Sequence, residues 1–192
     1  MRRFVFVAHN VPSNGEWSLD DLPGSGGRVD VVVRNLQAAI HLSHGIRADV
    51  DCYVVLSAGR VIRIEGGRIQ RLNPDERSTA ARLQQALKET GSGPSWKEVQ
   101  KGLWVADLSL QDLLVELPGN HILLDPEGEK LQSESFDNPT FFLSDHLPFT
   151  QDEYRLLSSA RRVSIGTPWY HGNHVVAVVN HHLDAARVSE VR

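Results

Sequence analysis

Short runs of β-branched and aromatic residues alternate with segments of helical apolar spacing along most of this 192-residue chain. Residues 4–8 and 50–56 are typical of buried strands, because they are almost wholly apolar and short. Between them, apolar residues recur at helical spacing from Val29 to Ile40 and mark one buried helix face. Strands that alternate with helices predict an α/β fold with a mostly parallel sheet flanked by helices, and the length suits one domain over residues 1–192.

Glycine, proline and capping residues divide the rest of the chain. Gly45 is expected to end the helix after Val29, and Gly66-Gly67 to turn a hairpin over residues 60–69. Asn73 matches the cap of a helix that runs to about residue 88, and residues 91–94 should interrupt the chain as a flexible insertion. Further strands are expected at 103–105, 121–124, 140–143 and 163–165, and further helices at 110–117, 150–161 and 175–186.

Charge and cysteine content limit the cellular setting. The formal net charge is −4, which disfavours a uniformly basic surface but allows a local basic face for nucleic acid. The single cysteine, Cys52, cannot form an internal disulfide, which favours a reducing cytoplasmic location. No apolar run reaches the length of a membrane span or of a signal peptide, so no membrane partner is expected.

Few catalytic motifs stand out from the residues alone. The nine histidines are densest at His171 and His174, but Gly172 and Asn173 between them argue against a helical metal pair, so no metal is predicted. Neither a GxSxG elbow nor a GxGxxG fingerprint is present. Two loops, residues 144–148 and 166–174, each follow a predicted buried strand. In an open parallel sheet, functional loops lie beyond the carboxyl ends of strands.

Four arginines in the first half of the chain, three of them close to predicted helix ends or loops, are candidates for contacts with RNA phosphates, because the guanidinium fork suits phosphate oxygens. These are Arg28, Arg34, Arg47 and Arg77. Ordinary solvated charges are the alternative for each of them. The residues by themselves therefore lead to an α/β domain with two structured strand-end loops, and they do not name a reaction.

Several stretches resemble the archaeal tRNA pseudouridine-54 N1-methyltransferases, which belong to the knotted SPOUT class. One is the motif Leu143-Ser144-Asp145-His146, and the others are residues 20–30, 41–49, 72–77, 171–174 and 180–184. The resemblance covers most of the chain in the same order and is weakest over residues 91–135. It implies a deep trefoil knot near the C-terminus, a homodimer, S-adenosyl-L-methionine as methyl donor and the T-loop of tRNA as substrate.

The resemblance also implies where the cofactor lies. In this family, main-chain groups in the knot hold it, and by motif position those contacts fall at Leu124, Ser144, Ile165, Gly166, Thr167, Pro168, Trp169, Tyr170 and Val175. The chain departs from the pattern at two of them: Val175 replaces the usual cysteine, and Ser144 stands where glycine is frequent. Contacts made through the main chain tolerate both changes.

The chemistry of such an enzyme requires positioning and removal of a proton. Pseudouridine N1 must lie in line with the methyl group, and its proton must leave as the bond forms. Asp30 and Asp75 are the candidates to take that proton or to orient the base, and Trp169 or Tyr170 to stack on a base. A tRNA pseudouridine N1-methyltransferase is the leading hypothesis, with no DNA partner. The alternatives are an rRNA enzyme of the same class and a non-catalytic RNA-binding relative that lacks the cofactor site.

Overall fold

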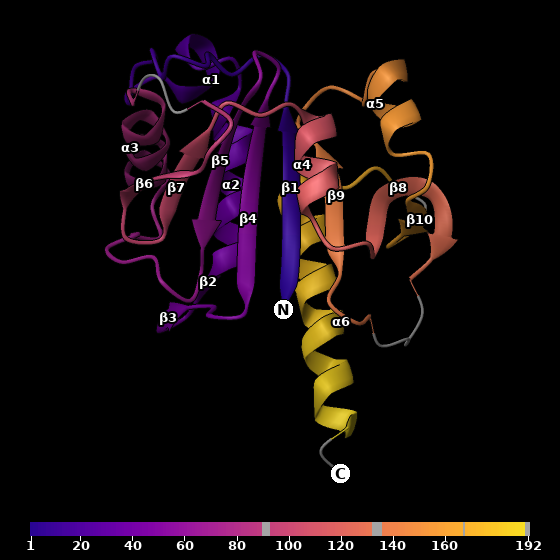
Figure 1. Ribbon diagram of the computed structural model, residues 1–192. Coiled ribbons are helices and arrows are strands. Elements are labelled where there is room, and N and C mark those ends of the chain that lie inside the picture. The colour runs from indigo at the N-terminus through magenta and orange to yellow at the C-terminus, as the bar shows by residue number, and fades with distance from the viewer. Residues whose placement is uncertain (90–92, 132–135, 167, 191–192) are drawn as a thin grey trace.

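The computed structural model describes residues 1–89, 93–131, 136–166 and 168–190 of the chain. Within these residues, helices lie on both faces of an eight-stranded sheet (Figure 1). No helix in the described part is long and apolar enough to cross a membrane. Across the sheet the strands are β10 (Arg161–Ser164), β8 (His121–Lys130), β9 (Thr140–Ser144), β1 (Arg2–Ala8), β4 (Val50–Leu56), β5 (Arg60–Glu65), β7 (Leu103–Ala106) and β6 (Lys97–Gln100).

The helices divide between the two faces of the sheet. One face carries α2 (Val29–Ile40), α3 (Glu76–Leu87) and the long α6 (Gly172–Glu190), which lies behind β1 and β9 in Figure 1. The other face carries α4 (Leu110–Glu116) and α5 (Gln151–Leu156). A short helix, α1 (Leu22–Ser25), and a small hairpin of β2 (His41–Leu42) with β3 (Gly45–Ile46) lie outside these layers.

Strand β1 lies inside the parallel half of the sheet, with a parallel neighbour on each side. It pairs in parallel with β4 on one side and with β9 on the other, and β8 and β10 continue the parallel order. The apolar side chains of β1 alternate between the two faces, so both helical layers pack against it, as buried parallel strands require. The predicted α/β fold with a mostly parallel sheet is confirmed, although β5, β7 and β6 add an antiparallel wing.

Helix α2 begins and ends at residues that differ from the expected ones. Arg28 precedes it in the left-handed conformation, and the helix ends at Ile40 because His41 turns to an extended conformation and starts the β2–β3 hairpin. The prediction that Gly45 ends this helix is therefore wrong, since Gly45 belongs to β3. The buried face runs through the apolar residues as expected.

Two other predicted boundaries are wrong. Residues 60–69 do not form a hairpin, because β5 pairs with β4 and β7, and the turn lies instead at Gly59, whose φ is +73°. Asp75 rather than Asn73 caps α3, accepting a hydrogen bond from the Ser78 N–H at 2.8 Å.

The capping box of α5 is confirmed: Thr150 and Glu153 each bond the other's main-chain N–H. The helix nevertheless ends at Leu156, five residues before the predicted end. The expected insertion at residues 91–94 falls in part on residues 90–92, which lie outside the described chain.

A buried arginine ties α6 to the first strand. Arg2 is 1% exposed and donates hydrogen bonds to Asn180 Oδ1 at 2.8 Å, Asp49 Oδ2 at 3.0 Å and Asp184 Oδ1 at 2.7 Å. Arg47 binds the same Asp184 through both carboxylate oxygens, at 2.8 and 2.9 Å. Burial by itself would raise the pKa of Asp184, but the bonds from Arg47 and Arg2 outweigh it and lower that pKa. The network holds the C-terminal helix against the amino end of β1.

We expect Arg2→Met to lower the free energy of unfolding by roughly 2 kcal/mol at neutral pH, because it leaves the buried Asn180 oxygen without this donor. Urea denaturation measures the change. Since the pKa of Asp184 is lowered, the ion pair stabilises the protein above about pH 4 and is lost as the pH falls below that. The difference between variant and parent should therefore shrink in acid.

The matched control is Arg155→Met, which removes an arginine that is paired to Asp152 on the surface. It should change stability by no more than about 0.5 kcal/mol. Equal losses in the two variants would show that the Arg2 network does not anchor α6.

Candidate functional site

The carboxyl ends of three adjacent parallel strands form one edge of the sheet. Leu124 follows the part of β8 that pairs with β9, Ser144 ends β9, and Ile165 follows β10; all three are half-buried. Ser144 lies beside Val7 of β1. The structure thus brings together the predicted cofactor contacts from three separate stretches of sequence, in the crevice position where open α/β sheets bind ligands.

The segment after β10 carries the remaining predicted contacts. Ser164 Oγ donates to Gly166 O at 2.8 Å and accepts from Gly166 N at 3.1 Å, which shapes the turn that leaves the strand. Trp169 is 81% exposed and Tyr170 is 47% exposed, so neither packs in the core. Pro168 is exposed as well, and Thr167 lies outside the described residues.

The first turn of α6 packs against the buried side-chain amide of Asn35. Val175 is half-buried in this turn, and a Cβ added to Gly172 would lie 2.7 Å from Asn35 Oδ1 and 2.8 Å from its Nδ2. Asn35 is 1% exposed, and within the described chain neither of its side-chain polar atoms has a hydrogen-bond partner. A buried unsatisfied amide is rare and often marks a site that a ligand or water completes.

These features fit the nucleoside cofactor that the resemblance implies. The half-buried strand ends offer accessible apolar and main-chain contacts, and Asn35 offers a donor and an acceptor beside the start of α6. The N-terminus of this 19-residue helix also has main-chain N–H groups without helical partners. Asn35 was not predicted as a site residue from the sequence. The signal that could have identified it is a polar residue on a mostly apolar helix face.

A buried carboxylate holds two arginines at the start of α2. Asp30 is 3% exposed and accepts from Arg28 Nε at 3.0 Å, from a second Arg28 nitrogen at 3.2 Å, and from Arg34. Burial would raise the pKa of Asp30, but the hydrogen bond and charge of Arg28, with the charge of Arg34, outweigh it and lower that pKa. The two guanidiniums are about half exposed and face solvent as an oriented pair.

Asp75 does not join this cluster. Its carboxylate caps α3, and the bond from Ser78 lowers the pKa of Asp75. The next turn of α3 contacts the second half of α2 through Thr79 and Gln37, seven residues beyond Asp30 and hence about 10 Å along the axis. The two candidate catalytic carboxylates therefore lie in separate surroundings.

The other two predicted RNA-binding arginines also lie apart from Arg28 and Arg34. Arg47 is largely buried in its ion pair with Asp184. Arg77 is exposed and pairs with Asp20 at 2.6 Å. Only Arg28 and Arg34 are brought together.

A histidine that the sequence reasoning missed links β1 to the loop after β9. The His9 main-chain N–H donates to Asp145 Oδ2 at 2.8 Å, His9 Nδ1 lies 2.9 Å from Asp145 Oδ1, and His9 Nε2 lies 3.0 Å from Glu153 Oε2. Burial would lower the pKa of His9, but the bonds to both carboxylates outweigh it and raise that pKa. The sequence signal that could have identified His9 is its position directly after the buried strand β1.

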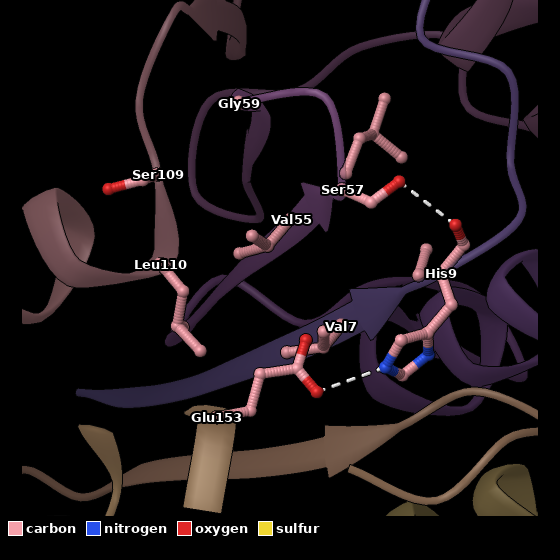
Figure 2. A pocket seen from close by; sticks show the side chains of 10 residues that line it. Val7, His9, Val55, Ser57, Gly59, Ser109, Leu110 and Glu153 are labelled. Carbon is pink, nitrogen blue, oxygen red and sulfur yellow. Dashed lines mark hydrogen bonds and ion pairs between the residues drawn. The ribbon is translucent and has the colours of Figure 1, made fainter. Parts of the chain in front are cut away.

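A cavity of about 150 Å³ opens beside His9 at the ends of β1 and β4 (Figure 2). Its walls are largely apolar, with Val7, Val55 and Leu110, and the polar groups at its rim include Ser57 and Glu153. The dashed lines in Figure 2 mark the His9–Glu153 contact and the bond from Ser57 Oγ to the His9 carbonyl, at 2.9 Å. His9 thus stands between this cavity and the loop at Asp145.

Metal-ligating side chains do not converge in the described ranges. No group of three His, Cys, Asp or Glu residues there is placed to hold a metal ion. The rings of His171 and His174, the pair considered from sequence, have centroids 5.7 Å apart at the start of α6.

A family model described as "Putative SAM-dependent RNA methyltransferase" matches residues 1–188. The chain belongs to this family. S-adenosyl-L-methionine is therefore the methyl donor of this family. The expected resemblance is confirmed over nearly the whole chain.

Curated relatives of this methyltransferase are similar along their full length. The tRNA (pseudouridine(54)-N(1))-methyltransferase of Halobacterium salinarum is 38% identical over 191 residues, which cover 97% of each chain. The protein of the same name from Thermococcus kodakarensis is 39% identical, covering 96% of this chain and 99% of its own. The Haloferax volcanii protein of that name is 37% identical, covering 98% and 99%.

A solved structure shares the fold of this methyltransferase. Archaeoglobus fulgidus Nep1, crystallised with S-adenosylhomocysteine, matches with a TM-score of 0.70 and 17% sequence identity over 96% of this chain and 98% of its own. The two chains therefore share a fold, which agrees with the α/β architecture that the resemblance implied.

We expect Gly172→Ala to lower the free energy of unfolding by roughly 1–3 kcal/mol, because the new methyl group would press on the buried Asn35 amide and displace the start of α6. Thermal and urea unfolding measure this. Gly45→Ala is the control, since nothing lies within 4 Å of its added Cβ. A loss no larger than that of the control would contradict the close packing of α6 on α2.

Proposed function

We propose that this chain transfers a methyl group from S-adenosyl-L-methionine to N1 of pseudouridine 54 in the T-loop of tRNA. The observation that carries the proposal is its similarity over full length to several tRNA (pseudouridine(54)-N(1))-methyltransferases, at up to 39% identity. The site supports it, because strand ends, a helix start and an oriented arginine pair gather at one end of the parallel sheet. One domain over residues 1–192 would carry the whole activity.

The proposed cofactor site is the crevice at the ends of β8, β9 and β10. Leu124, Ser144 and Ile165 lie at its strand edge, Gly166, Pro168, Trp169 and Tyr170 follow β10, and Val175 lies in the first turn of α6. Thr167, also proposed as a contact, lies outside the described residues. When bound there, the sulfonium of S-adenosyl-L-methionine supplies an activated methyl group that needs no metal. The residues of the chain hold the methyl donor and the acceptor base in line, which is the main contribution of such a site to the rate.

The proposed RNA-binding surface begins at Arg28 and Arg34. Asp30 fixes both guanidiniums, so they are oriented before RNA binds and lose little entropy on contact with phosphates. Asp30 is the main cause of the raised pKa of Arg28, through its hydrogen bond and its charge, and the negative charge of Asp145, in the loop that follows Ser144, adds a smaller contribution. Arg77 extends the proposed surface, and Arg47 serves α6 instead.

Asp30 and Asp75 remain the proposed carboxylates for the proton that leaves N1. Both have lowered pKa values, which makes each a weak base and favours orientation of partners over protonation. Asp30, beside the arginine pair, suits that orienting role. Trp169 and Tyr170, both exposed on the knot segment, are proposed to stack on an unstacked base.

We further propose that the chain acts as a homodimer in the cytoplasm, where its RNA substrate resides. The outward side of α6 carries the apolar Val178, 43% exposed, and the preceding segment presents Trp169. A second copy of the chain would cover these apolar groups, which monomers rarely leave together on their surface.

Incubation with isotopically labelled S-adenosyl-L-methionine and two tRNA transcripts tests the proposal. One transcript carries pseudouridine at position 54 and the other uridine, and mass spectrometry of the nucleosides locates the methyl group. We expect labelled N1-methylpseudouridine from the first transcript alone. Methylation of an rRNA fragment in place of tRNA would support the rRNA alternative, and binding of RNA without binding of the cofactor would support a non-catalytic role.

We expect Arg34→Gln to weaken tRNA binding about fivefold to tenfold and to reduce the slope of log affinity against log salt concentration by about 1, because one phosphate contact is lost. Affinity for S-adenosylhomocysteine should stay unchanged. Filter binding at several salt concentrations, with calorimetry for the cofactor product, gives both values.

Arg68→Gln is the matched control, because Arg68 has similar exposure and is also held by carboxylates, Glu65 and Glu98, but lies beside the antiparallel wing. It should leave tRNA binding unaltered. An equal loss in the two variants would mean that the arginine pair on Asp30 is not a specific RNA contact.

A further inference from the structure

The surroundings of His9 indicate which protonation state the fold requires. Each ring nitrogen lies within hydrogen-bond distance of a carboxylate oxygen, Nδ1 of Asp145 and Nε2 of Glu153. A neutral imidazole carries one N–H, so it would turn a lone pair toward one of the two carboxylates. The imidazolium has two N–H groups and can donate to both. The geometry therefore selects the charged form.

The two carboxylates belong to different elements. Asp145 lies in the loop after β9, next to the proposed cofactor contact Ser144, and Glu153 lies in the first turn of α5. The side chain of Asp145 is 1% exposed, and His9 is 12% exposed. One half-buried histidine thus joins the end of β1, the loop after β9 and α5.

Asp145 also sets the path of its own loop. Its main-chain N–H donates to Val7 O at 3.0 Å, its Oδ1 accepts from Leu147 N at 2.9 Å, and Leu147 O accepts from Ser144 Oγ. A shift of the Asp145 carboxylate would therefore move the residues on either side of it, including Ser144.

Other titratable groups face the same pair. His146 Nδ1 lies 3.6 Å from Asp145 Oδ2, and Arg28, which is bonded to Asp30, lies within the field of Asp145. Glu153 Oε2 accepts in addition from Thr150 N at 2.7 Å, and Asp145 accepts from the main-chain N–H groups of His9 and Leu147. When His9 loses its proton, each carboxylate keeps these main-chain donors, but the ring can no longer donate to both. Loss of the proton should therefore weaken the link between the loop and α5.

We propose that His9 is a positioning residue for the methyl donor: as an imidazolium bonded to Asp145 and Glu153, it holds the Ser144–Asp145–His146 loop in its cofactor-binding conformation. This inference rests on the proposed function, because it takes Ser144 as a cofactor contact. It adds that cofactor binding is linked to one proton on His9.

The direction of the pH effect follows from the raised pKa of His9. The bonds to Asp145 and Glu153 outweigh the effect of burial and raise the pKa of His9, so the ring stays charged at mildly acidic pH, and its contribution to cofactor binding is lost as the pH rises through that raised value. Cofactor affinity should therefore be highest at mildly acidic pH and should fall in alkaline solution.

Calorimetric titration of the full chain with S-adenosylhomocysteine, from about pH 6 to about pH 9 at constant ionic strength, tests this. We expect the affinity of the parent protein to fall about fivefold, the effect of one hydrogen bond. His9→Gln keeps a neutral donor and does not titrate, so this pH-dependent loss should be absent. The ligand's own amino group titrates identically with every variant, so differences between proteins isolate His9.

Two further variants sharpen the assignment. Glu153→Gln retains the capping box of α5, since glutamine also serves in that motif. It removes the negative charge of one of the two carboxylates that face the His9 ring. It should lower the pKa of His9 and move the affinity midpoint to lower pH. His44→Gln, at an exposed position in the turn between β2 and β3, is the control and should leave the midpoint unchanged.

Nuclear magnetic resonance of the histidine ring provides a readout without the ligand. The His9 signals should titrate above the usual pKa in the parent protein and at lower pH in Glu153→Gln, and ligand binding should raise the midpoint in both. A parent affinity that is the same at about pH 6 and about pH 9, or a loss that persists fully in His9→Gln, would overturn the inference. Absence of any binding at about pH 6 would instead count against the proposed function.

Discussion

Parallel pairing on both edges of β1 is the constraint on which the site depends. β4 and β9 come from residues about 50 and about 140 places along the chain, yet both lie in register with Arg2–Ala8. Because parallel strands end on the same edge, this pairing brings His9, Ser144 and the loop at Asp145 to one place. The long connections that parallel strands require carry α2, α4 and α5, whose first turns lie near this edge.

The two ends of β1 have different electrostatic roles. At the amino end, Arg2 is almost completely buried and joins Asn180 and Asp184 of α6 to the strand. At the carboxyl end, His9 joins the strand to Asp145 and Glu153. The first network positions the helix whose start sits on Asn35, and the second positions the loop that contains Ser144. Both depend on charges held where water reaches them poorly, so removing one partner leaves another polar group unsatisfied.

At the surface, the arginine pair on Asp30 is also held in place by an opposite charge. A buried carboxylate with a lowered pKa is a poor proton acceptor, but it is a good support for the two guanidiniums that we propose to contact RNA phosphates. The net charge of −4 does not conflict with this proposal, because local potential rather than net charge steers RNA to a small group of oriented arginines.

The sequence by itself determined the α/β class, most strands and helices, the capping box at Thr150 and the family, because apolar periodicity and short motifs are local properties. It did not determine where α2 ends, since the β2–β3 hairpin overrides Gly45, nor that residues 60–65 pair with β4 and β7. Arg28 and Arg34 meet on Asp30 through local contacts two and four residues apart, whereas the tertiary structure alone decided that Arg47 binds Asp184 of α6. It alone decided that His9 lies between Asp145 and Glu153, because those contacts join residues more than 130 positions apart and no local pattern encodes them.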